Sequence, residues 1–135
     1  MTTREWKVIG AAVVAVAIAF AAGWVWGSAG GRTAERELQG VRLQQALTEA
    51  RSRILAARVD LYRLNFGSAA TNLEEAKAPL EDAAAAFDGR REEERAAAVR
   101  RAIASAEEAR RLAAQVDQAA QGAAERALDD IQRAH

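Results

Sequence analysis

The chain of 135 residues has room for one small domain and a short additional segment. Its 19 basic and 19 acidic side chains cancel, so no global field is expected to draw it to nucleic acid. Alanine, arginine, glutamate and leucine dominate a composition that favours helix, and the absence of cysteine excludes disulfides and thiolate metal sites. We therefore expect an all-α protein.

The first expected element is an uncharged, mostly apolar stretch over residues 8–26. As a helix it would rise about 28 Å, close to the roughly 30 Å thickness of the hydrocarbon layer of a bilayer. Trp6 stands at one end and Trp24 and Trp26 at the other, as in an interfacial belt. A secretory signal has a shorter apolar region. We therefore expect a retained transmembrane helix; a cleaved signal and a helix buried in a soluble core are the alternatives.

Small residues recur at every fourth position of this stretch, so a helix would present them as one stripe. Such stripes let two helix backbones approach closely within lipid, although an alanine-rich span also produces them by chance. The transmembrane helix contact predicted on this basis consists of Ala11, Ala15, Ala19, Gly23 and Gly27.

The orientation of the span depends on its flanks, where lysine and arginine are almost equally frequent. The short basic tail over residues 1–7 is easier to keep inside than a domain is. We therefore expect the tail in the cytoplasm, the span in the cytoplasmic (inner) membrane, and the rest of the chain outside the cytoplasm.

A Gly/Ser joint over residues 27–31 precedes the helical domain of residues 32–135. In the helix expected over about residues 33–65, apolar positions alternate at intervals of three and four, which is typical of a packed helix face. The pattern stops at residues 65–68, where Asn and Gly tolerate the left-handed conformation that ends helices. We expect a tight turn there, with Tyr62 and Phe66 closing that end of the domain.

Two further helical segments complete the expected domain. One covers about residues 69–87, begins near a capping-box sequence, and is either kinked at Pro79 or restarted near Ala78. The other covers residues 90–134, either unbroken or interrupted near residues 117–122. Short connections make neighbouring helices antiparallel, so we expect a bundle of three helices, or four if the last segment is interrupted. The predicted bundle seam consists of Leu43, Leu47, Ile54, Leu61, Leu64, Leu73, Leu80, Phe87, Val99 and Ile103.

The sequence offers no catalytic constellation. Its one histidine is the terminal His135, and without cysteine no side chain pair supplies an activated nucleophile. Successive acids such as Glu74 and Glu75 diverge by 100° on a helix and favour solvated faces over a metal site. We therefore expect no enzyme activity, no cofactor, no metal, no nucleic acid and no small-molecule substrate.

The alanines at many seam positions bury little area, so the bundle would gain stability from self-association or from a partner. The sequence thus favours a single-pass, membrane-anchored helical scaffold or adaptor that acts through helix-mediated protein association. Its expected partners are the lipid bilayer and either further copies of itself or another protein. The alternative is a membrane-anchored sensory or ligand-binding bundle.

Overall fold

The computed structural model describes residues 34–135, which are helical apart from short turns and contain no strand. This confirms the all-α prediction for the described part of the chain. The first helix covers residues 34–62. The elements that follow are α2 (Phe66–Glu75), α3 (Lys77–Gly89), α4 (Glu93–Ala114) and α5 (Ala120–Ala134).

The predicted transmembrane helix lies outside the described residues, as do the flanking tryptophans and the stripe of small residues. Those positions are Trp6, Trp24, Trp26, Ala11, Ala15, Ala19, Gly23 and Gly27. Within residues 34–135, no helix combines the length and the apolar character that a membrane span requires.

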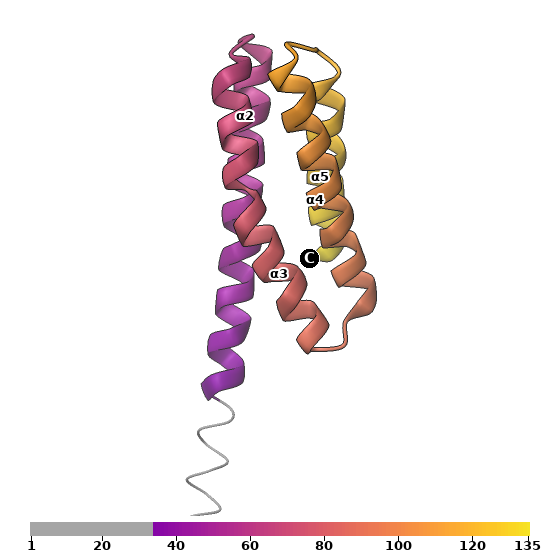
Figure 1. Ribbon diagram of the computed structural model, residues 1–135. Helices are drawn as coiled ribbons and strands as arrows, with labels where there is room; N and C mark the ends of the chain where they lie inside the picture. The colour runs from indigo at the N-terminus through magenta and orange to yellow at the C-terminus, as the bar shows by residue number, and fades with distance from the viewer. Residues whose placement is uncertain (1–33) are drawn as a thin grey trace, which may run out of the picture. The chain divides into compact units, whose positions relative to one another are not determined.

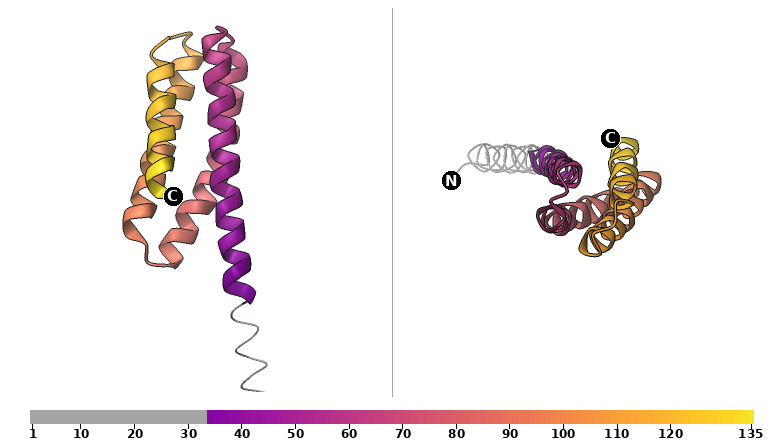
Figure 2. Two further views of the ribbon diagram at one scale, coloured as in Figure 1. Left: turned by 180° about the vertical axis from the view of Figure 1, so that it is seen from behind. Right: turned by 90° about the horizontal axis from the view of Figure 1, so that it is seen from above.

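The compact unit formed by residues 40–135 is an antiparallel bundle. The first helix runs one way, α2 and α3 return together, α4 runs back and α5 returns beside it (Figure 1). α4 packs against α2, α3 and α5, and a 2.9 Å ion pair between Arg58 and Glu125 joins the first helix to α5. The two views in Figure 2 show the same order from behind and from above. The predicted helical bundle is therefore confirmed.

Leucine, isoleucine, valine and phenylalanine side chains form the large-residue part of the core. The largest of them, Phe87, is 1% exposed, and Ile54 and Leu61 are fully buried. Ile103 is partly buried against this cluster. The remaining seam positions that lie in the core are Leu43, Leu47, Leu73, Leu80 and Val99.

The contact between α4 and α5 is built almost entirely of alanine. Apart from Val99, Asp130 and Ile131, every buried residue of these two helices is an alanine. A methyl side chain lets helix backbones approach closely but removes little apolar area from water. α4 and α5 are therefore held by close backbone packing rather than by large interdigitating side chains.

Asp130 is the one buried charged residue among those described, with 7% of its surface exposed. Its Oδ1 atom accepts hydrogen bonds from Arg101 Nε of α4 at 3.4 Å and from Arg133 Nη1 of its own helix at 3.1 Å. A buried carboxylate needs such partners because leaving it unpaired is costly. Arg101 therefore links α4 to α5 at this level, and Arg133 pairs with the carboxylate from within α5.

Three turns of the bundle end helices with non-glycine residues in the left-handed conformation. Leu64, Arg91 and Val116 have φ angles of 58°, 58° and 59°. At the first turn, the amide of Asn65 donates to the carbonyl of Asp60 at 2.8 Å, in the pattern of a Schellman motif. The prediction that Leu64 belongs to the seam is therefore wrong: the helix has already ended, and the Leu64 side chain is 60% exposed.

The second helical segment starts earlier than residue 69 and breaks earlier than Pro79. The Asn65 side chain caps α2 by accepting from the Ser68 amide at 3.4 Å, so the helix begins at Phe66. The interruption falls at Ala76, and Pro79 is the third residue of α3. A proline lacks an amide hydrogen and clashes with the preceding turn, so it is tolerated in the first turn of a new helix.

The last segment consists of two helices, α4 and α5, separated by residues 115–119. This corresponds to the interrupted form of the two that the sequence allowed. Asp117 Oδ1 accepts a hydrogen bond from the backbone amide of Ala119 at 2.8 Å, just before α5 begins. Gly122, at the end of the range where the sequence allowed an interruption, lies inside α5.

Candidate interaction surface

The face of the first helix that points away from the core carries a second regular row of side chains. Val41, Leu55, Val59 and Tyr62 are between 41% and 65% exposed, although all four are large and largely apolar. Three exposed polar residues, Gln45, Thr48 and Ser52, fill the positions between them. We call this row the outer stripe: Val41, Gln45, Thr48, Ser52, Leu55, Val59 and Tyr62.

The outer stripe and the core seam occupy different sides of the same helix. An α-helix turns 100° per residue, so positions four and three apart stay on one face. The stripe follows positions 41, 45, 48, 52, 55, 59 and 62, while the seam follows 43, 47, 50, 54, 57 and 61. One helix therefore offers a buried face to its own bundle and a separate exposed face to solvent.

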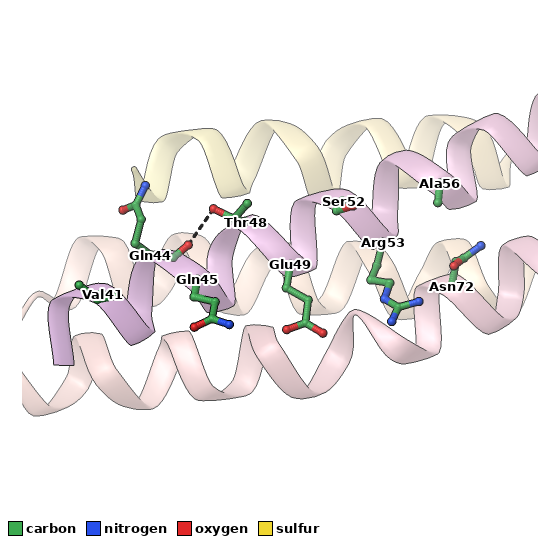
Figure 3. Close-up of a pocket in the computed structure, with 9 residues that line it drawn as sticks. All are labelled: Val41, Gln44, Gln45, Thr48, Glu49, Ser52, Arg53, Ala56 and Asn72. Atoms are coloured by element: carbon green, nitrogen blue, oxygen red, sulfur yellow. Dashed lines mark hydrogen bonds between the residues drawn. The ribbon is translucent and has the colours of Figure 1, made fainter. Parts of the chain in front are cut away.

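An open groove of about 800 Å³ runs along this exposed face. Figure 3 shows that its walls come almost entirely from the first helix, with Asn72 contributed by α2. The Thr48 hydroxyl is already occupied, because it donates to the Gln44 carbonyl at 2.8 Å. The amides of Gln44 and Gln45 and the hydroxyl of Ser52 lie on the groove wall. The groove can thus accept apolar and hydrogen-bonding side chains from an elongated partner.

Ion pairs fix the first helix in the bundle on both sides of the stripe. Arg53 pairs with Glu75 of α2, and Arg58 pairs with Glu125 of α5. The Arg58 guanidinium also lies over the Tyr62 ring, 5.7 Å from its centroid. The Tyr62 side chain, and to a lesser extent the Glu125 carboxylate, raise the pKa of Arg58. Burial of the core seam makes the outer stripe face outwards, and these exposed contacts add little to that orientation.

Tyr62 and Phe66 do not close the end of the bundle together. Tyr62 is 59% exposed and belongs to the outer stripe, whereas Phe66 packs partly buried against the core. The helix ends immediately after Tyr62, so its ring follows the outer face instead of turning over the core.

The acidic pairs Glu74/Glu75 and Glu107/Glu108 are engaged by arginine and lysine. Glu107 pairs with Lys77 at 2.9 Å, and Glu108 pairs with Arg126 at 2.8 Å. The Glu107 carboxylate raises the pKa of Lys77, mainly through their hydrogen bond. Within residues 34–135, no group of three or more histidine, cysteine, aspartate or glutamate residues is placed to hold a metal ion.

The chain matches no protein-family model, and neither curated proteins nor solved structures gave a match. A role for the bundle has to be argued from its own surface.

Sequence reasoning placed the functional contacts in the membrane and in the seam, and it did not identify the outer stripe. The signal was present in the alternating spacing from Val41 to Tyr62. It was weak because Gln45, Thr48 and Ser52 interrupt the apolar pattern, and because the stronger core seam of the same helix has the same period.

Proposed function

We propose that this protein is a single-pass, membrane-anchored scaffold or adaptor whose helical bundle binds protein through helix–helix contacts. The observation that carries the proposal is the outer stripe, in which four exposed apolar side chains and three polar ones repeat at helical spacing along one face of the first helix. Its regular spacing fits another helix better than it fits an irregular loop.

The anchor in this proposal is the apolar stretch over residues 8–26, with Trp6 on one side and Trp24 and Trp26 on the other. The proposed location is the cytoplasmic (inner) membrane with the bundle outside the cytoplasm. Only seven residues, 27–33, lie between position 26 and residue 34, where the described helix begins.

A role in binding rather than catalysis is supported by the state of the acidic side chains. Glu74, Glu75, Glu107 and Glu108 are each paired with a basic residue on the surface of the bundle. Asp130, the buried acid, is held by two guanidinium groups. A general acid or base needs a carboxyl group that faces a substrate, and these carboxylates face arginine or lysine.

The groove beside the stripe is the feature that favours the alternative, a ligand-binding bundle. Small-molecule sites usually bury 70–90% or more of the ligand surface. This groove is open and lies along the outside of one helix, so a small ligand would remain mostly in water. A helix laid along it would be covered much better, which favours the scaffold.

The first test of the proposal is extraction of membranes that contain the full chain. With carbonate at high pH, the protein should remain in the pellet, and release into the supernatant would contradict the anchor. Photo-crosslinking in native membranes at native expression should trap a homo-oligomer or a defined larger complex. A purely monomeric species would contradict the scaffold.

Gly23→Ile and Gly27→Ile variants separate the two places where association can occur. Isoleucine at these positions would keep two backbones apart within the membrane. Loss of the complex in these variants would assign the contact to the span, and its retention would assign it to the bundle.

A further inference from the structure

We propose that the partner of the outer stripe is the outer stripe of a second copy of this chain, paired side by side and parallel in a two-stranded coiled coil. The inference rests on the proposed function for the shared membrane anchor, which gives both copies the same direction. It goes further by naming the partner, the surface and the register.

The spacing of the stripe is that of a coiled-coil seam. Positions 41, 48, 55 and 62 recur at seven residues, and positions 45, 52 and 59 form the second row between them. From Val41 to Tyr62 the helix rises about 32 Å, or three heptads. Because the core seam uses other positions, a second helix can bind the stripe without disturbing the bundle.

In a parallel, in-register pair, each residue of the outer stripe faces the identical residue of the second copy. Val41, Leu55, Val59 and Tyr62 would each meet the same residue of the second copy. The three polar layers would meet polar side chains, whereas an antiparallel pair centred on the stripe would place Gln45 near Val59 and Thr48 near Leu55. Polar layers in such a seam weaken the association but fix its register and favour two strands.

The charged residues beside the stripe give one attractive and one repulsive pair in this arrangement. In a parallel coiled coil, flanking positions five residues apart face each other across the seam. Glu37 of one copy would then face Arg42 of the second copy, an attractive pair. Arg58 would face Arg63 of the second copy, but Arg58 is held at 2.9 Å by Glu125 of its own bundle, which lowers the repulsion.

The membrane anchor explains why a second copy would be available in this geometry. Two spans in one membrane with the same orientation would bring both first helices to the same side of the membrane. Confinement to the membrane also raises the effective concentration of the two stripes, so a seam with polar layers can pair without a high affinity in solution.

The absence of cysteine makes a direct test available in the full chain. Val41→Cys and Leu55→Cys place single thiols at two layers of the stripe, and Ala104→Cys places one on an exposed position of α4 as the control. A disulfide requires Cα atoms about 4.4–6.8 Å apart. With mild oxidation of native membranes, both stripe variants should form homodimers at least tenfold faster than the control.

The pattern of products distinguishes the other occupants. An antiparallel pair would link neither Val41→Cys nor Leu55→Cys to itself, and a foreign helix would give no dimer at either position. Either result, or equal rates at the stripe and at position 104, would overturn the proposal. A dimer linked at both layers supports it.

A second variant checks that the disulfides report a pre-existing contact. Leu55→Lys in the Val41→Cys background should lower the rate of dimer formation about tenfold, because it places like charges in the seam, whereas Ala104→Lys should not. Both positions are exposed, so circular dichroism should show an unchanged bundle. An unchanged rate with Leu55→Lys would overturn the proposal. The stripe variants could form no disulfide-linked dimer while photo-crosslinking still traps a complex. That combination would reject the stripe as the binding site and would not contradict the scaffold role.

Discussion

Replacing Ile54 with alanine gives the sharpest test of the bundle core. Ile54 is fully buried at the centre of the seam of the first helix. Its neighbours one turn away on the same face, Ala50 and Ala57, are also fully buried. Alanine has no rotamers, so these neighbours cannot turn into the space that the substitution would leave.

The expected cost follows from this poor capacity to refill the cavity. Truncation of a buried isoleucine to alanine costs about 2–5 kcal/mol, and the cost is larger where the surroundings cannot collapse. A gain of a few tenths of a kcal/mol in helix propensity offsets little of this. We expect the Ile54→Ala variant to lose about 3 kcal/mol or more of the free energy of unfolding, a large part of the 5–15 kcal/mol typical of a domain.

Urea unfolding of the full chain in detergent, followed by circular dichroism, measures this loss. With a slope of about 1–3 kcal/mol per molar urea, the midpoint should fall by about 1–3 M. Leu64→Ala is the matched control, because Leu64 was placed in the same seam by spacing but is 60% exposed. The control should change the free energy of unfolding by less than about 0.5 kcal/mol. Equal effects of the two substitutions would refute the assignment of Ile54 to the core and Leu64 to the surface.

Two other substitutions test the turns and the buried acid. Val116→Gly should stabilise the bundle by about 0.5–1 kcal/mol in thermal unfolding, because a β-branched residue at a φ of 59° is strained and glycine is not; a lower melting temperature would contradict this. Asp130→Ala should destabilise the bundle by about 1–2 kcal/mol in urea unfolding, since it removes the acceptor shared by Arg101 and Arg133. The exposed neighbour supplies the control: Asp129→Ala should have little effect, and equal losses would argue against a buried role for Asp130.

The core-facing side of the helices could be predicted because it depends on one periodicity. Leu47, Ile54 and Leu61 fall at the heptad spacing and lie in the core. The helix ends could not be placed as well. The three-and-four spacing of apolar positions continues to Leu64. The helix has nevertheless ended by then, as the hydrogen bond from the Asn65 amide to the Asp60 carbonyl shows. Nothing in the sequence marks a leucine as the left-handed residue, because that position is usually glycine.

The outer stripe was harder to predict than the core for a related reason. The buried seam can be recognised from the three-and-four spacing of large apolar residues alone, because such a row must face the core. A surface stripe is recognised only when it is known which face the bundle leaves uncovered. The interruption at Ala76 shows the same limit: Pro79 predicts a break nearby, but the choice of residue depends on how α2 and α3 each pack against α4.

The alanine contacts between α4 and α5 have a thermal consequence. Each buried alanine hides little more than one methyl group, so unfolding exposes less apolar surface per residue than in a leucine-rich bundle. The heat capacity of unfolding grows with that surface, by about 0.45 cal/K/mol for each apolar Å². A small heat capacity of unfolding makes the curve of unfolding free energy against temperature less strongly bent. Such a bundle loses stability more gradually, on heating or on cooling from its temperature of maximum stability, than a leucine-rich bundle with the same maximum stability.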